Sequence, residues 1–333
     1  MNMTMKKIAE MAGVSRPAVS TVLGNSKSTR VSAKTRKKVL HLAKPPSKEP
    51  DAGSLYVQVC EGLGRQHPSL LGSGTTMKQR LASGQVLLGL AQALPAAGIV
   101  ESMACGWDFI WIDGQHGQID YNAMLDCQRT ADSLGLLTML RVPTHEPGLL
   151  GLYADVGSSA LMVPLVNSVE EAGRIIEGLC FPPLGNRSYG GGRLILLEGP
   201  EYHRQHEMVV VAQIESVEAV EAAEEIAGME GIDVLFFSPA DMRVRMGIPL
   251  GTPILEHEQS RSAMIRTAKA ARKAGKYAGT VAGDGPLAQA AVEMGYQLIA
   301  GGGDAAFLRA ASQTRLNELQ TALNKNKKKG RNR

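Results

Sequence analysis

The side chains best suited to chemistry lie at or just after the ends of apolar runs in the middle of the chain. They include one imidazole, one guanidinium and several carboxylate, amide or hydroxyl groups, which together can bind a cation, hold a carboxylate substrate and move a proton. Because they belong to separate runs, one architecture must bring those run ends together. The residues are Asp113, His116, Arg141, Gln213, Glu215, Ser238 and Asp241.

Two of the carboxylates are the candidate metal ligands. Glu215 and Asp241 offer hard oxygen atoms, which suit Mg²⁺ or Mn²⁺ with water in the remaining positions. Gln213 lies two residues before Glu215, so both side chains would point to the same face of a strand.

The other polar groups suit proton transfer and anion binding. His116 can exchange a proton near neutral pH, and Asp113 is able to hold its ring in one tautomer. Arg141 offers a planar fork for a substrate carboxylate. With a divalent metal, this set predicts a site that stabilises an enolate.

The elements that must position these groups are short apolar runs alternating with amphipathic helices. The helical stretches are 121–134, 168–179, 217–227, 258–274 and 286–294. This alternation predicts a parallel sheet covered on both faces, and eight repeats favour a (β/α)8 TIM barrel, whose chemistry collects at the carboxyl ends of its strands. A doubly wound sheet is the alternative, but no G-x-G-x-x-G follows the first run. The runs are 86–90, 109–112, 136–140, 161–166, 209–214, 234–237, 277–281 and 298–300.

The first 44 residues have the pattern of a separate, small all-α domain. Thr4 and Ser15 are expected to cap two helices separated by Gly13, with Pro17 in the first turn of the second helix. Ser32 is expected to cap a third. A helix, a tight turn and a helix followed by a supporting helix form the helix-turn-helix arrangement.

The residues of this block resemble the DNA-binding headpiece of lactose-repressor-type (LacI) regulators over about residues 4–43. The resemblance rests on residues 4–15, Val19-Ser20, Val22-Leu23, Val31-Ser32 and Thr35-Arg36. It implies that the second helix binds in the major groove of double-stranded DNA. The implied base-facing residues are Arg16, Pro17 and Thr21, and the implied phosphate contacts are Ser15 and Ser20. Residues 43–50 are Pro-rich and charged where the family has a hinge helix, which puts hinge-dependent bending of the DNA in doubt.

The remaining segments carry weaker signals. Residues 45–75 are expected to be a linker with no assigned structure, 76–318 the barrel, and 319–333 a basic, disordered tail whose charge allows a non-specific contact with phosphate. Gly301–Gly303 with Asp304 resembles a glycine-rich phosphate-binding loop after the last apolar run. The carboxylate of Asp304 would repel phosphate, so the pattern favours a turn.

The charge is divided unevenly along the chain. Residues 1–50 carry a net charge of +9, residues 51–324 carry −11 and residues 325–333 carry +6. Nucleic-acid contact is therefore expected at the ends and not on the body. The four cysteines are widely spaced, and neither a long apolar stretch nor a secretory signal is present, which favours a cytoplasmic protein without a membrane segment.

The body resembles the HpcH/HpaI aldolases, which are metal-dependent class II pyruvate aldolases, over about residues 76–312. The resemblance implies that Glu215 and Asp241 bind the metal, with pyruvate or a related 2-oxo acid chelating it. It implies an acid/base role for His116 with Asp113, and stabilisation of the enolate by Arg141. The matching motifs are 107–116, 162–167, 181–187, 212–216 and 231–241.

The resemblance also implies cleavage of a 4-hydroxy-2-oxo acid to pyruvate and an aldehyde, in a homo-oligomer between a dimer and a hexamer. Arg141, Gln213, Ser238 and Ala240 are the predicted substrate-binding residues. The sequence departs from the family pattern at Gln115, at Ser238 and at Ser188, which puts substrate choice and rate in doubt.

Two functions remain open from the sequence. In the first, the chain is a working lyase fused to a DNA-binding block, which makes it a regulator with enolate chemistry or 2-oxo-acid sensing. In the second, it is a catalytically silent repressor whose barrel only senses a ligand. A sensor needs binding groups but no proton-transfer group, so the complete set of polar residues favours the first function.

Overall fold

The computed structural model describes residues 5–23, 31–43, 75–190 and 192–330. The chain divides into two compact units, Met1–Gly62 and Leu63–Arg333. Thr4 and residues 45–74 of the predicted linker lie outside the described residues.

In its described residues, the first unit has three short helices around a small aliphatic core, as predicted. They are α1 (Met5–Ala12), α2 (Arg16–Leu23) and α3 (Ala33–Ala43). Gly13 has a φ of 67° between α1 and α2, a conformation that glycine adopts without a steric cost. The hydroxyl of Ser32 accepts the N–H of Thr35 and so caps α3. Ile8, Val19, Val22 and Val39 are buried between the helices.

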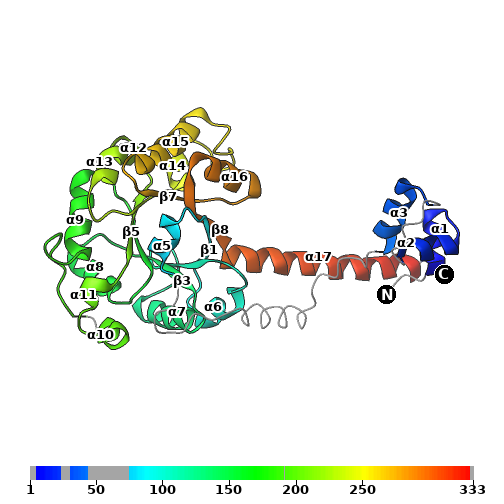
Figure 1. The fold of residues 1–333 in the computed structure, drawn as a ribbon, viewed down its shortest axis with the longest axis horizontal. Helices are drawn as coiled ribbons and strands as arrows, with labels where there is room; N and C mark the ends of the chain where they lie inside the picture. The colour runs from blue at the N-terminus through cyan, green and yellow to red at the C-terminus, as the bar shows by residue number, and fades with distance from the viewer. Residues whose placement is uncertain (1–4, 24–30, 44–74, 191, 331–333) are drawn as a thin grey trace. The chain divides into compact units, whose positions relative to one another are not determined.

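The second unit is a closed barrel of eight parallel strands in sequential order, which confirms the predicted (β/α)8 fold and excludes the doubly wound sheet (Figure 1). Each predicted apolar run becomes a strand, because a strand buried on both faces needs apolar side chains on both. The strands are β1 (Leu87–Gln92), β2 (Phe109–Asp113), β3 (Leu137–Arg141), β4 (Ala160–Val163), β5 (Val209–Ile214), β6 (Val234–Phe237), β7 (Tyr277–Val281) and β8 (Tyr296–Gly303).

Helices surround the strands on the outside, and side-chain caps mark where several of them begin. Asp120, Ser168, Ser216 and Asp284 each accept a backbone N–H in the first turn of the helix that follows. These helices are α6 (Ala97–Met103), α7 (Tyr121–Ser133), α8 (Pro147–Ala154), α9 (Val169–Leu179), α10 (Gly192–Glu198), α11 (Tyr202–Gln205), α12 (Val217–Glu221), α13 (Ala223–Gly228), α14 (Pro239–Arg245), α15 (Glu258–Lys273) and α16 (Gly285–Met294). The last helix, α17 (Asp304–Gly330), follows β8 and is exposed over residues 305–324 instead of covering the strands.

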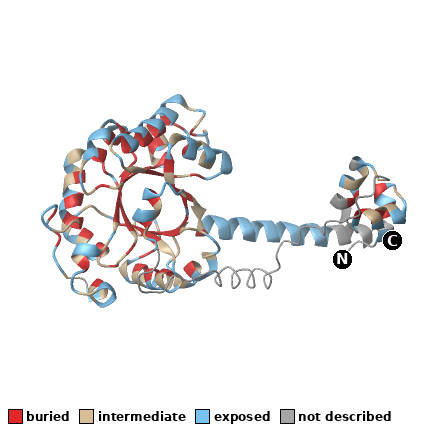
Figure 2. Ribbon diagram, viewed as in Figure 1, coloured by how far each residue is buried: buried red, intermediate tan, exposed pale blue. Residues whose placement is uncertain are grey.

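The apolar residues form an inner core and an outer core. Figure 2 shows the ring of strands as the most buried part of the unit. Inside the ring, Phe109, Trp111 and Phe236 pack with aliphatic side chains, and α5 (Met77–Ala82) contributes Met77 and Leu81 to the same cluster. Since α5 directly precedes β1, it closes the end of the barrel at which the strands begin.

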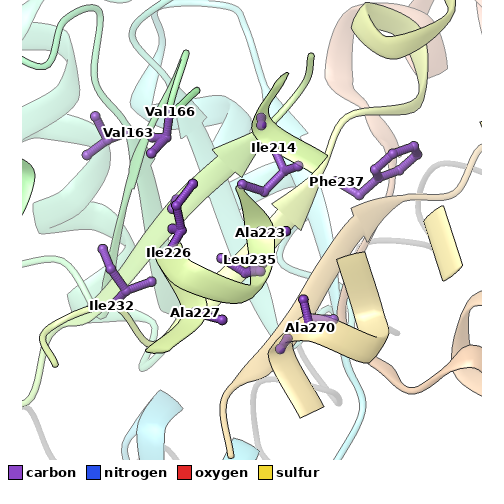
Figure 3. Packing of buried hydrophobic residues seen from close by; sticks show 14 of the residues in the cluster. Val163, Val166, Ile214, Ala223, Ile226, Ala227, Ile232, Leu235, Phe237 and Ala270 are labelled. Carbon is purple, nitrogen blue, oxygen red and sulfur yellow. The ribbon is translucent and has the colours of Figure 1, made fainter. Parts of the chain in front are cut away.

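Outside the ring, the strands pack against the helices. Figure 3 shows Ile226 and Ala227 of α13 beside Ile214 and Leu235, which belong to β5 and β6. Such close packing fixes the strands as a rigid frame for the loops at their carboxyl ends.

Three expectations about individual elements were wrong. The stretch 217–227 forms two helices, α12 and α13, and not one. Gly301–Gly303 belongs to β8 instead of a turn, because parallel pairing with β1 extends to Gly303. The tail expected to be disordered from residue 319 is helical to Gly330 in α17, whose Ala, Leu, Arg, Gln and Glu residues are good helix formers. No helix within the described residues is long and apolar enough to span a membrane.

Candidate active site

The barrel gathers most of the predicted polar residues at the carboxyl ends of its strands. Asp113 ends β2 and Arg141 ends β3, while Gln213 and Glu215 come from the end of β5. Ser238 follows β6. All five are buried, although polar side chains inside a protein are unfavourable unless they are paired. The remaining predicted residues are more accessible: His116 and Ala240 are exposed, and Asp241, in the first turn of α14, is half-buried.

Asp113 and Arg141 form a two-pronged ion pair between neighbouring strands. The register places Asp113 beside Arg141. The Nε atom of Arg141 donates to Oδ1 of Asp113 at 2.8 Å, and Nη2 donates to Oδ2 at 2.6 Å. Burial raises the pKa of Asp113, but the hydrogen bonds and the charge of Arg141 outweigh it, so the pKa lies below its usual value. The Asp113 carboxylate is therefore ionised at neutral pH.

No direct hydrogen bond joins Asp113 to the ring of His116, so a shared acid/base role for the two residues, through a bridging water, stays a prediction. Oδ1 of Asp113 instead accepts the backbone N–H groups of Gln115 and His116, at 3.0 and 3.2 Å. Both carboxylate oxygens also accept hydrogen bonds from Arg141, so Asp113 joins this arginine to the backbone of the His116 loop. Asp113 thus holds the backbone of the His116 loop and leaves the imidazole exposed.

The amide of Gln213 links the ion pair to the second carboxylate. Its Nε2 donates to Oε2 of Glu215 and to Oγ of Ser238, each at 2.7 Å. Its Oε1 faces Nη1 of Arg141 at 3.5 Å. Asp113, Arg141, Gln213, Glu215 and Ser238 therefore form one connected polar network, which we call the polar cluster.

The other oxygen of Glu215 is held by the loop after β4. The N–H of Leu165 donates to Oε1 of Glu215 at 2.7 Å. Burial raises the pKa of Glu215; the Leu165 N–H lowers it, and the nearby charge of Asp241 raises it further. The net shift is upward, as expected for a buried carboxylate near a second one.

Sequence reasoning missed two residues of this site. Leu165 acts through its backbone, and no property of a leucine side chain predicts that. The ring of Trp111 lies under Arg141, with the guanidinium carbon 4.7 Å from the ring centroid. Its position two residues before Asp113 was a usable signal, since alternate residues of a strand share a face.

Comparison with known proteins identifies the second unit. The sequence profile of the HpcH/HpaI aldolase/citrate lyase family matches residues 92–311. The chain belongs to the HpcH/HpaI aldolase family. This makes it a member of a family of carbon–carbon lyases, with the polar cluster where the fold places an active site.

Several members of the HpcH/HpaI family align over most of their length. A 4-hydroxy-2-oxovalerate aldolase from Rhodococcus jostii is 32% identical over 72% of this chain and 93% of its own. A hydroxypyruvate/pyruvate aldolase from Pseudomonas aeruginosa is 30% identical over 69% of this chain and 87% of its own. The crystal structure of a family protein from Burkholderia cenocepacia, 30% identical, superposes with a TM-score of 0.68 over 73% of this chain and 98% of its own.

These HpcH/HpaI relatives do not account for the first unit, which matches a different family. Residues 4–45 match the profile of bacterial regulatory proteins of the lacI family. The three-helix arrangement agrees with that match. On α2 and just before it, Ser15, Arg16, Pro17 and Ser20 are exposed. Thr21 is half-buried, and its hydroxyl donates to the carbonyl of Pro17 at 2.9 Å.

Proposed function

We propose that the barrel is a metal-dependent aldolase that cleaves a 4-hydroxy-2-oxo acid to pyruvate and an aldehyde, and that the first unit binds double-stranded DNA. The chain would then be a transcriptional regulator that also performs, or responds to, 2-oxo-acid chemistry. The observation that carries the catalytic half is the buried polar cluster, because buried charged groups with a shifted pKa, gathered at the carboxyl ends of barrel strands, are typical of active sites.

The two carboxylates Glu215 and Asp241 fit a divalent cation, Mg²⁺ or Mn²⁺. Burial and the nearby charge of Asp241 both raise the pKa of Glu215, and a cation held by these carboxylates would stabilise their ionised forms. Within the described parts of the chain, no group of three or more His, Cys, Asp or Glu gathers as a ligand set. Two protein carboxylates, with substrate and water completing the shell, are typical of Mg²⁺ sites.

A bound cation would act as a Lewis acid that stabilises the negative charge developing on the keto oxygen of the substrate. The other tasks fall to the chain itself. Arg141 binds a substrate oxygen through N–H groups that Asp113 does not use, and Gln213, Ser238 and Ala240 line the substrate beside it. Because its imidazole is exposed, His116 can exchange its proton with solvent during each turnover.

Asp113 acts indirectly in this scheme. It orients the guanidinium of Arg141 and the backbone of the His116 loop at once. The acid/base role that the sequence suggested for the pair thus belongs to His116, and Asp113 positions it.

For the first unit, α2 is the helix proposed to enter the major groove. Arg16 is exposed and is the one predicted base-facing residue whose side chain can form a two-pronged contact with guanine. Ser15 and Ser20 are the proposed phosphate contacts and Pro17 a proposed base-facing residue; all three are exposed. The hydroxyl of Thr21 already donates to Pro17, so it retains only its acceptor capacity for a base.

We further propose that the chain works as a homo-oligomer in the cytoplasm, where DNA and 2-oxo acids are both available. Regulators of this type bind palindromic sites as dimers. Support comes from α17, on which Leu308, Leu316, Leu319 and Leu323 are exposed and available to a second copy of the chain.

The experiment that tests the catalytic proposal is exchange of solvent deuterium into the methyl group of pyruvate, followed by NMR with Mg²⁺ or Mn²⁺ present or removed by chelation. We expect exchange that requires the metal, is lost in Glu215→Ala and falls at least about 100-fold in His116→Ala. Glu218→Ala, which removes an exposed carboxylate from the next helix, is the matched control.

Two other outcomes are informative. Metal and pyruvate binding without exchange would favour the alternative, a catalytically silent repressor that uses the barrel as a sensor. Exchange that survives Glu215→Ala would contradict the assignment of the site.

A further inference from the structure

Trp111 occupies a distinctive place directly beneath the polar cluster. It lies on β2 two residues before Asp113, its side chain belongs to the apolar core inside the barrel, and it is 6% exposed. Its ring meets that of Phe236 edge to face, with centroids 5.6 Å apart and planes at 68°. Trp111 is thus a rigid part of the floor of the site.

The guanidinium of Arg141 rests on this floor. Its carbon lies 4.7 Å from the centroid of the Trp111 ring, within the range of a cation–π contact. Asp113 holds one edge of the same guanidinium through Nε and Nη2. The two contacts act in different directions, because the carboxylate fixes the guanidinium from its edge and the ring supports one of its faces.

The polar end of the indole has no such contact. Nε1 of Trp111 is buried and has no hydrogen-bond partner among the described residues. Burying a donor without a partner is unfavourable, so hydrogen bonding does not explain a tryptophan at this position. The face of the ring is the part that makes a specific contact, and that contact is with Arg141.

We propose that Trp111 is a positioning residue for the reaction. Its ring holds the guanidinium of Arg141 in the orientation that presents the remaining N–H groups to a substrate oxygen. The proposal rests on the function proposed above for Arg141. It assigns Trp111 no contact with substrate.

Two substitutions of Trp111 distinguish the contribution of its ring face to activity from the contributions of its N–H group and of its packing. Trp111→Phe keeps an aromatic face but removes the N–H, whereas Trp111→Leu removes the face. We expect kcat/KM for metal-dependent pyruvate exchange to fall about tenfold in Trp111→Leu and less than about threefold in Trp111→Phe, because phenylalanine makes a weaker cation–π contact.

Phe109→Leu is the matched control. Phe109 lies two residues earlier on β2, belongs to the same interior cluster and is also buried, but its ring is not the one beneath Arg141. Its loss should lower the melting temperature as Trp111→Leu does, while leaving kcat/KM within about twofold of the parent. An equal loss of kcat/KM in Phe109→Leu and Trp111→Leu would reduce the role of Trp111 to packing and overturn the proposal.

A spectroscopic readout tests the placement of Arg141 without any turnover. The Nε–H signal of Arg141 in protein labelled with ¹⁵N-arginine is identified by its absence from Arg141→Lys. The ring current of Trp111 should shift it upfield in the parent and in Trp111→Phe, but not in Trp111→Leu.

The outcomes are distinct. A parent without exchange but with the shifted signal disproves the proposed function and leaves the ring contact established. An unshifted signal in the parent, or a loss in Trp111→Phe as large as in Trp111→Leu, overturns the positioning role.

Discussion

At the scale of single residues, the site depends on charges that would be unfavourable alone. Arg141 and Asp113 are each less than a tenth exposed, and each is the main partner of the other. Desolvation of either ion costs several kcal/mol, which the ion pair recovers only while both partners remain. Removing Arg141 should therefore change the protonation of Asp113.

Arg141→Met should reverse the pH dependence that Asp113 gives to stability. In the parent, the pKa of Asp113 lies below the ordinary value of 3.8, so its contribution is present above that pH and is lost as the pH falls through the folded-state pKa. Without Arg141, burial dominates and raises that pKa, so the folded variant binds a proton that the unfolded chain releases. The stability of the variant then falls as the pH rises through this pKa.

Urea denaturation from about pH 4 to neutrality measures this effect. The difference in unfolding free energy between parent and variant should widen as the pH rises. Arg129→Met, which removes an exposed arginine, should give a difference that is nearly independent of pH. A constant difference for Arg141→Met as well would contradict the lowered pKa of Asp113.

The identities of the polar residues could be predicted from the sequence, but their pairing could not. Asp113, Arg141, Gln213 and Glu215 are recognisable because each ends an apolar run. The partner of Asp113 depends on the register between β2 and β3, which places it beside Arg141. A pattern of apolar and polar residues along one strand contains no information about that register.

At the scale of elements, the loop after β4 shows how backbone geometry serves the site. Leu165 has a φ of 58°, which is unfavourable for a leucine. The loop is held there by Nδ2 of Asn167, which donates to the Leu165 carbonyl, and by Ser216, which donates to Oδ1 of Asn167. The strained conformation aims the Leu165 N–H at Glu215.

Leu165→Gly should be better tolerated than Leu165→Val, in contrast to the usual order for a loop leucine. Glycine adopts a positive φ freely, whereas valine adds a branch at Cβ to the existing clash. We expect the unfolding free energy of the glycine variant to exceed that of the valine variant by about 1–2 kcal/mol, measured in urea. The opposite order would mean that Leu165 does not have a positive φ in solution.

The start of α17 is held in place by a buried carboxylate. Asp304 is 1% exposed and its two oxygens accept the N–H groups of Ala93 and Leu94, both at 3.0 Å, in the loop after β1. Extension of β8 through Gly303 brings Asp304 to this loop. The sequence suggested a turn because three consecutive glycines resemble one, and the pairing with β1 that orders them is not visible locally.

Asp304→Ala should leave both N–H groups, which are partly buried, without this partner. A buried loss of this kind costs about 1–3 kcal/mol for each group, so we expect the unfolding free energy to fall by at most about 6 kcal/mol and by at least about 2 kcal/mol. Asp126→Ala, which removes an exposed aspartate, should change it by less than about 0.5 kcal/mol. Equal effects of the two substitutions, measured in urea, would show that the Asp304 contacts do not form.

At the scale of the whole molecule, the division of the chain into two units could be predicted from the sequence more accurately than any contact between individual residues. The basic block of residues 1–50 and the acidic body correspond to separate compact units, with the division at residue 62. Such units can be recognised from the sequence because the charge and apolar patterns that define each unit extend over many residues. The helical part of the tail was missed because α17 is exposed, and exposed helices lack a strong apolar pattern.

The same division of charge predicts which parts of the chain bind DNA. Residues 1–50 carry +9 and residues 325–333 carry +6, whereas the body between them carries −11 and should be repelled by phosphate. Binding of the full chain to a random-sequence duplex should weaken steeply as salt rises, because each phosphate contact releases a counterion. Fluorescence anisotropy at several salt concentrations gives the slope.

Deletion of residues 1–44 should abolish this binding, whereas deletion of 325–333 should only reduce the slope. Lys269→Ala, which removes an exposed lysine of the barrel, should change neither affinity nor slope.

Arg16→Ala tests sequence-specific binding, on a duplex enriched from a random library. The substitution should weaken binding to this duplex by about 1–3 kcal/mol and leave binding to a random duplex nearly constant, because base contacts determine the DNA sequence that is bound and phosphate contacts do not. If binding persists without residues 1–44, the tail and not the helix-turn-helix domain holds the DNA, and the regulatory proposal fails.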